Sequence, residues 1–156
     1  MLKFNRTTEY GLIALRHLSQ RASGEAASAR EIAEVYGLPF DILAKTLQRL
    51  KEAGIVQSAQ GARGGYMIQR QLEQVTLAEF LELMEGAGGV VACVEQADDE
   101  PACEFQGRCQ IHSMMRGLNA RMKAFLSSVR LSEFTSISKG QDIVTLESFK
   151  NTQVGT

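Results

Sequence analysis

Three cysteines and a histidine lie within one segment of twenty residues, CVEQADDEPACEFQGRCQIH, which runs from Cys93 to His112. Nine residues separate Cys93 from Cys103, five separate Cys103 from Cys109, and two separate Cys109 from His112. Thiolates and imidazoles suit zinc or an iron-sulfur cluster, whereas calcium and magnesium prefer oxygen ligands. The segment is therefore a candidate metal or cluster site. The alternative is that the cysteines are incidental, or that two of them form a disulfide and leave the third free.

Two segments with helical periodicity flank these residues. The motif Thr76 to Glu79 has the spacing of a capping box and opens a predicted helix that ends at Gly86. On the other side a long helix is expected from about Gln110 to Val129, about 30 Å in length. Its apolar residues are spaced 4, 3, 4, 3 and 4 positions apart, which is a heptad seam and predicts a homodimer through this helix. The residues of the seam are Ile111, Met115, Leu118, Met122, Phe125 and Val129.

The first half of the chain predicts three helices and a hairpin. A helix is expected from Thr7 or Thr8, whose hydroxyl can cap it, to about Arg21, with His17 as a partly buried core residue. A second capping box, Ser28 to Glu31, opens a short helix that ends at Gly37. A third helix is expected over residues 40–53, with Leu43, Leu47 and Leu50 on its core face. Two strands follow at residues 55–58 and 66–68, joined by the glycine-rich segment 59–65.

This succession is typical of a winged helix-turn-helix that binds DNA. The outward face of the third helix would contact a groove and the phosphates, and Arg63 at the tip of the hairpin would enter a minor groove. The fold class expected is therefore mainly α, a winged helix-turn-helix DNA-binding domain with a long C-terminal dimerisation helix. The residues expected to contact DNA on the third helix are Pro39, Asp41, Ala44, Lys45 and Arg49.

Composition agrees with such a protein. Residues 1–70 carry ten Lys or Arg and six Asp or Glu, a net +4, and the remainder carries seven against twelve, a net −5, which sum to −1. A basic first half suggests an anionic partner. There is no run of eighteen apolar residues and no apolar core of a signal peptide, so a cytoplasmic protein without a membrane partner is expected. An odd number of cysteines favours thiol or metal chemistry in a reducing compartment over a secreted disulfide framework.

The residues also resemble a known family. A Thr-Glu-Tyr-Gly start, the helix-turn-helix, the wing Gly-Ala-Arg-Gly-Gly-Tyr, the clustered cysteines and the long helix together resemble the IscR/NsrR family of bacterial iron-sulfur regulators over about residues 1–134. The resemblance implies a dimeric winged-helix protein that binds an operator in double-stranded DNA. It also implies that the protein senses iron-sulfur cluster status, iron, redox conditions or nitric oxide through a bound cluster.

The family's ligands can be placed on this sequence. By resemblance, Cys93, Cys103 and Cys109 are the three thiolate ligands, and the fourth is either His112, as in IscR, or Glu9 from the partner subunit, as in NsrR. The nine residues between Cys93 and Cys103 exceed the five typical of IscR and NsrR and are nearer to the SUF-system regulators of the same family. An iron-sulfur cluster is expected, with a 2Fe-2S form favoured over 4Fe-4S. Two alternatives stay open, a structural zinc site with three cysteines and a histidine, and a cluster-free thiol redox sensor.

The expected organisation has four parts. They are a DNA-binding domain at 1–86, a cysteine-rich loop at 87–110, the dimerisation helix with a short turn at 111–134, and a polar tail at 135–156. An enzyme is not expected, because the chain lacks paired carboxylates, a nucleophile beside a base, and a phosphate-binding loop.

Overall fold

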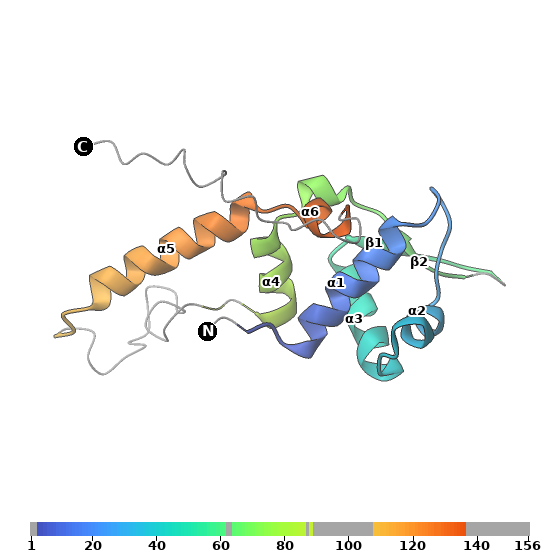
Figure 1. Ribbon diagram of the computed structural model, residues 1–156, viewed down its shortest axis with the longest axis horizontal. Helices are drawn as coiled ribbons and strands as arrows, with labels where there is room; N and C mark the ends of the chain where they lie inside the picture. Colours follow the sequence, from blue (N-terminus) through green and yellow to red (C-terminus); the bar gives the residue numbers. More distant parts are fainter. Residues whose placement is uncertain (1–2, 62–63, 87, 89–107, 137–156) are drawn as a thin grey trace.

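The computed structural model describes residues 3–61, 64–86, 88 and 108–136. A helical body carries a two-stranded wing on one side, and a long helix leaves the body on the other side (Figure 1). The elements, in chain order, are α1 (Arg6–Ser19), α2 (Ala29–Tyr36), α3 (Phe40–Glu52), β1 (Val56–Ala59), β2 (Gly65–Ile68), the 3₁₀ helix η1 (Leu72–Gln74), α4 (Leu77–Glu85), α5 (His112–Ser128) and α6 (Leu131–Thr135).

The helix-turn-helix forms as the sequence predicts. Ser28 caps α2 by accepting a hydrogen bond from the backbone N–H of Glu31 at 3.1 Å. Gly37 ends α2 with a φ of 64°, a left-handed conformation that glycine adopts without steric cost. Helix α3 then begins at Phe40, and Leu43, Leu47 and Leu50 are completely buried, so its core face is the expected one.

The start of α1 differs from the sequence prediction. The capping residue is Asn5, whose side chain accepts a hydrogen bond from the backbone N–H of Thr8 at 2.8 Å. The prediction that Thr7 or Thr8 caps the helix was therefore wrong. The Thr8 hydroxyl is instead buried and serves a tertiary contact with α4. The helix ends at Ser19 rather than near Arg21.

The wing is an antiparallel hairpin in which Val56 pairs with Ile68 and Ala59 pairs with Gly65. Strand β2 also bridges to the residue before α2, since Ala27 and Tyr66 exchange backbone hydrogen bonds of 3.0 and 2.8 Å. A Cβ on Gly65 would lie 2.4 Å from the carbonyl carbon of Ala27. Only glycine permits this approach, so the end of β2 next to the hairpin loop is held against the residue before the α2 cap.

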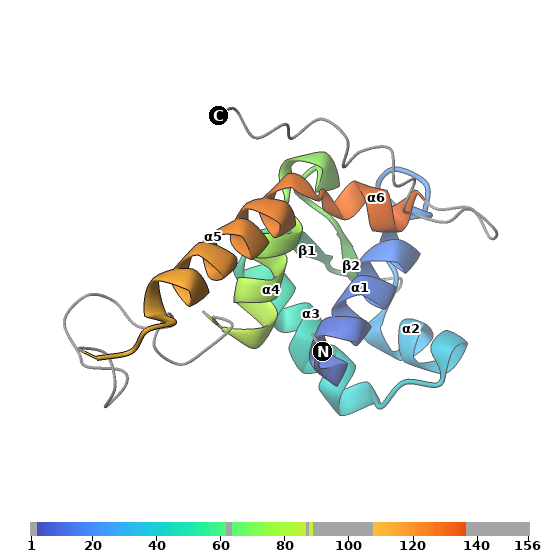
Figure 2. The ribbon, with the colours of Figure 1, turned by 60° about the vertical axis from the view of Figure 1, so that its left-hand side comes forward.

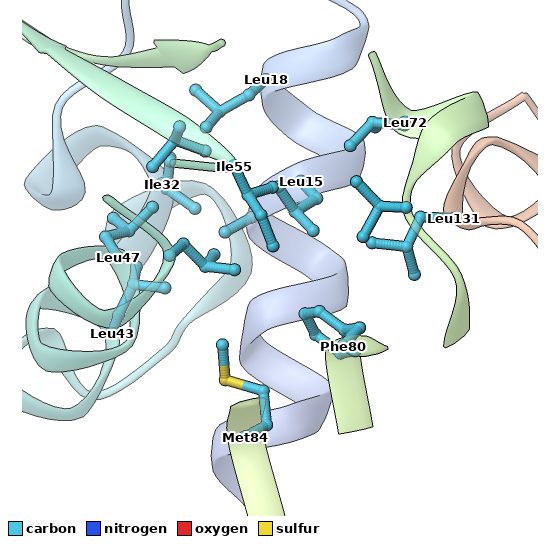
Figure 3. Close-up of a cluster of buried hydrophobic side chains, with 14 of the residues drawn as sticks. Leu15, Leu18, Ile32, Leu43, Leu47, Ile55, Leu72, Phe80, Met84 and Leu131 are labelled. Carbon is cyan, nitrogen blue, oxygen red and sulfur yellow. The ribbon is translucent and has the colours of Figure 1, made fainter. Parts of the chain in front are cut away.

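A single apolar core holds these elements together (Figure 3). Phe80 from α4 is fully buried against α1, and a Cβ on Gly11 would lie 2.9 Å from its ring. Burial of a large side chain of this kind contributes about 1.5 to 3 kcal/mol. The labelled members of the cluster are Leu15, Leu18, Ile32, Leu43, Leu47, Ile55, Leu72, Phe80, Met84 and Leu131.

The C-terminal end of α5 is fixed to the body by a short helix that the sequence patterns did not predict. Leu131, the first residue of α6, is buried, and its N–H donates to the carbonyl of Val75 at 3.0 Å. The N–H of Leu77 donates to the carbonyl of Val129 at 2.8 Å. Helix α6 packs on α1 and η1 (Figure 2). One end of α5 is thus attached to the start of α4, while the other end extends away from the body.

Candidate functional site

The cysteine-rich segment connects the end of α4 to the start of α5. Cys93 and Cys103 lie outside the described residues. Cys109 is half-buried, forms no disulfide and stands three residues before α5 begins. His112 is the first residue of α5 and is also half-buried. The structure therefore places one thiol and one imidazole together at the outer end of α5.

The other candidate ligand, Glu9, lies in the first turn of α1. Its carboxylate pairs with the Arg6 guanidinium at 3.0 Å, and both side chains are well exposed. Within the described residues, no group of three or more His, Cys, Asp or Glu is arranged to hold a metal ion. That search does not include Cys93 and Cys103.

The last turn of α4, just before the cysteine-rich segment, is tied to α1. The Glu85 carboxylate accepts hydrogen bonds from the Thr8 hydroxyl at 2.7 Å and from the backbone N–H of Asn5 at 3.0 Å. Glu85 therefore holds the capped N-terminus of α1, only a few residues from Glu9. No signal in the sequence pairs Glu85 with residues that lie about 80 positions earlier, and its role was missed.

The last turn of α4 also contacts α3, the second helix of the helix-turn-helix. The Arg49 guanidinium donates a hydrogen bond to the backbone carbonyl of Met84 at 3.3 Å. The Met84 side chain is buried in the core. Arg49 was expected to contact DNA, and in this structure its guanidinium also secures α3 to the end of α4. Two adjacent residues of α4 thus contact both α3 and α1.

The outward face of α3 has the character that the sequence predicts. Pro39, Asp41 and Lys45 are exposed, and Ala44 is half-buried. No carboxylate among the described residues forms an ion pair with Lys45. Arg63, which was expected at the tip of the wing, lies outside the described residues.

A polar cluster joins the C-terminal end of α1 to α2. The Arg21 guanidinium donates to Nε2 of His17 at 3.2 Å and pairs with the Glu31 carboxylate. Because Nε2 accepts, Nδ1 carries the proton and donates to the Tyr36 hydroxyl at 3.3 Å. Burial and, second, the positive Arg21 lower the pKa of His17 below its usual value of 6.5. Glu31, 3.7 Å from Nε2, acts in the opposite direction, but its charge is already paired with Arg21.

This cluster makes stability depend on pH. In the unfolded chain His17 takes up a proton near pH 6.5, whereas in the folded chain it does so only at lower pH. The unfolded state then binds more protons, so the free energy of unfolding should fall as the pH drops from about 7.5 through about 6.5 to about 5.5. Urea unfolding of the wild type and of His17→Gln at the two ends of this range measures the effect. The variant should lose less stability, and an equal loss in both proteins would contradict the assignment.

Helix α5 presents an apolar surface that the described part of the chain covers only in part. None of its residues is buried, and Leu118 and Phe125 of the predicted seam are 41% and 48% exposed. Ile111, just before the helix, is 53% exposed, whereas Met115 and Met122 are half-buried. The seam therefore exists in the folded chain as a partly open stripe. The helix that carries it projects from the body (Figure 1).

The arrangement of helix-turn-helix, wing and projecting helix matches a known family. Residues 4–136 match the family model Rrf2, described as an iron-dependent transcriptional regulator. The chain belongs to the Rrf2 family. It is a transcriptional regulator with a DNA-binding winged helix, and the expected resemblance to IscR and NsrR is confirmed.

Two sequence relatives illustrate this Rrf2 membership. The transcriptional repressor NsrR of Streptomyces coelicolor is 28% identical over 139 residues, which cover 86% of this chain and 91% of the relative. The regulator IscR of Photorhabdus laumondii is 24% identical, covering 86% of this chain and 79% of the relative. Because the relatives are transcriptional regulators, the expectation that the chain is not an enzyme is confirmed.

Solved structures of regulators share the Rrf2 fold seen here. CymR, the global cysteine regulator of B. subtilis, superposes with a TM-score of 0.66 at 26% identity and covers 89% of this chain and all of its own. IscR of T. potens gives a TM-score of 0.61 at 21% identity, with 89% and 94% coverage. The expected fold class is therefore confirmed. Within the described residues, no helix has the length and apolar character needed to cross a membrane.

Proposed function

We propose that this Rrf2 regulator is a homodimer that binds an operator in double-stranded DNA and controls transcription through an iron-sulfur cluster held by Cys93, Cys103 and Cys109. One observation carries the proposal. The cysteine-rich segment begins directly after the turn of α4 that contacts both α3 and α1, and it ends at α5. Residues in this segment can therefore influence the DNA-binding helix and the dimer helix together.

The open stripe on α5 supports the homodimer. Burial of one apolar side chain contributes about 1.5 to 3 kcal/mol, and a pair of helices would bury several such side chains. The gross gain exceeds the cost of association, which is about 4 to 15 kcal/mol. With 17 residues, α5 is about 25 Å long, which is sufficient for a coiled-coil contact of more than two heptads. A dimer would also present two copies of α3 to successive major grooves about 34 Å apart.

The donor set fits an iron-sulfur cluster. Cys109 has a free thiol, and His112 at the start of α5 can supply nitrogen, as in sites of mixed thiolate and imidazole ligation. Glu9 is the alternative fourth ligand and would come from the partner subunit. When bound, the cluster supplies a group that reacts with oxidants or nitric oxide. The form expected is 2Fe-2S rather than 4Fe-4S.

The chain's own contacts suggest how the site affects DNA binding. Ligation through Cys93 would constrain the residues that follow Gly86, and hence the last turn of α4. Glu85 in that turn holds α1 through Thr8, and the carbonyl of Met84 holds Arg49 of α3. A displacement of this turn would therefore change the placement of α3 relative to the dimer helix. No contact between the cluster and DNA is needed.

The DNA-binding part is tested by Lys45→Ala and Arg49→Ala. Removal of one phosphate contact should reduce the slope of log affinity against log salt by about 0.9. Lys45 has no ion-pair partner among the described residues, so its variant should show the full reduction. Arg49→Ala should in addition lower the free energy of unfolding, because it removes the hydrogen bond to Met84. Fluorescence anisotropy over a range of salt concentrations, together with urea unfolding, measures both effects.

Unchanged salt slopes in both variants would contradict the assignment of α3 to the DNA phosphates. Lys123→Ala, which removes an exposed charge from α5 away from the apolar seam, is the matched control. Its slope should equal that of the wild type.

A second candidate keeps the dimeric regulator and leaves the thiols without iron. Cys109 is free and half-buried, so it suits either oxidation or zinc ligation. Iron, zinc and sulfide counts on anaerobically prepared protein distinguish the candidates. Iron with sulfide supports the cluster, zinc alone supports a structural site, and neither metal, with a thiol that oxidises reversibly, supports the redox sensor.

A further inference from the structure

Arg30 differs from the other arginines in the first described part of the chain, residues 3–61. Arg6 and Arg21 pair with glutamates, and Arg16 and Arg49 donate to backbone carbonyls. The contact of Arg30 in this part of the structure is with an aromatic ring, since its guanidinium lies 5.9 Å from the centre of the Phe40 ring. Its N–H donors are therefore available to an anion that the folded chain does not itself provide.

The place of Arg30 in its helix is not explained by helix stability. It lies in the first turn of α2, where the helix dipole favours negative rather than positive charge. Phe40 is likewise 46% exposed although it is large and apolar. Residues that violate local structural preferences, with no compensating stabilisation, are candidates for a functional role.

Arg30 lies where the DNA-binding elements meet. Phe40 is the first residue of α3, and Arg30 comes two residues after Ser28, which caps α2. The loop-side end of β2 is joined to the same part of the chain, because Ala27 pairs with Tyr66. In a helix-turn-helix, the helix before the recognition helix crosses the DNA backbone. Arg30 thus lies close in the chain to the residue that pairs with the wing, and its guanidinium lies beside the first residue of α3, the helix proposed to enter a major groove.

We propose that Arg30, oriented by the Phe40 ring, binds a phosphate of the DNA backbone between the groove that α3 enters and the groove that the wing approaches. The inference rests on the proposed DNA binding and adds a contact to it. The Arg30 guanidinium lies over the Phe40 ring, 5.9 Å from its centre, and its N–H donors lie in the plane of the group, where they suit bidentate binding of phosphate. Phe40 is a positioning residue, since it acts through Arg30.

The test uses anisotropy titrations of the full chain with a duplex of about 30 base pairs, selected by the protein from a random-sequence pool, and with a scrambled duplex of the same composition. Arg30→Ala should weaken binding to both duplexes by about tenfold and reduce the salt slope by about 0.9, because a phosphate contact carries no sequence information. Lys123→Ala should leave both values unchanged. An unchanged slope in Arg30→Ala would overturn the proposal.

Conservative variants separate orientation from packing. Phe40→Leu keeps an apolar side chain without the aromatic face and should show most of the loss seen in Arg30→Ala, whereas Phe40→Tyr should bind as the wild type does. In Arg30→Ala, adding Phe40→Leu should cause little further loss. Equal binding by the Leu and Tyr variants would contradict the role of the ring. If Lys45→Ala weakens binding and Arg30→Ala does not, only this inference fails. If selection from the random-sequence pool yields no duplex that the wild type binds, the proposed function fails.

Discussion

Leu118→Glu is expected to convert the proposed homodimer into a monomer and to weaken binding to a duplex with two half-sites by at least about 100-fold. Leu118 lies at the middle of the apolar seam of α5 and is 41% exposed in the single chain. A glutamate there would place a charge in the interface of two apolar helices, and removal of the buried leucine side chain alone corresponds to about 1.5 to 3 kcal/mol per chain. Sedimentation equilibrium measures the change in association.

The matched control is Ala120→Glu, which introduces the same charge into the same helix at an exposed position outside the seam. It should remain dimeric and bind DNA as the wild type does. Because no residue of α5 is buried within its own chain, both variants should keep the winged helix folded. A dimeric Leu118→Glu protein would show that the chains associate through another surface.

Cys109→Ser is expected to lose nearly all bound iron and sulfide. A serine hydroxyl is not deprotonated at neutral pH and is a poor substitute for the soft thiolate that an iron-sulfur cluster requires. Cys109 is only half-buried and lies outside the core, so the variant should fold and dimerise. Iron and sulfide counts with an anaerobic absorption spectrum measure the loss, and Ser113→Ala, a nearby exposed residue of α5, should retain the full complement.

The same measurement on two further variants identifies the fourth ligand. If His112 ligates, His112→Ala should lose or weaken the cluster and Glu9→Ala should not, and the reverse pattern identifies Glu9. Retention of full iron and sulfide by Cys109→Ser would contradict the proposed ligand set. Zinc in place of iron in the wild type would favour the structural site.

Local sequence patterns were sufficient for most of the helix-turn-helix. Leu43, Leu47 and Leu50 recur at helical spacing, and Ser28 and Gly37 mark the two ends of α2. Such signals depend on neighbours within one or two turns, which the sequence displays directly. The two strands of the wing were likewise predicted to within one residue.

Contacts between distant residues were not predictable in this way. Thr8 has the chemistry of a helix cap, but its hydroxyl donates to Glu85, and Asn5 takes the capping position. Helix α6 has only five residues, too few to show a helical periodicity in the sequence. It forms where Leu131 packs into the core. The link between Arg49 and Met84 also depends on the packing of two helices.

The candidate site was likewise predictable where it depends on local sequence and not where it depends on contacts between distant residues. Cys109 and His112 were found from residue type and spacing, and the structure places both at the outer end of α5. The part of the site that would transmit a signal, Glu85 and Met84, depends on tertiary contacts with α1 and α3 and carried no sequence signature. The sequence therefore indicated the candidate ligands, and the folded chain adds the contacts through which they are proposed to act on α3.

The proposed function requires that the state of the cysteine-rich site governs DNA binding through the contacts of Met84 and Glu85 with α3 and α1. The most direct test is an anaerobic titration of one selected duplex with cluster-loaded protein and with the same preparation after removal of the cluster, both verified as dimers. We predict that the two affinities differ by at least about tenfold, with equal salt slopes because the phosphate contacts are shared. Equal affinities of the loaded and the cluster-free dimer for every selected duplex would contradict the claim.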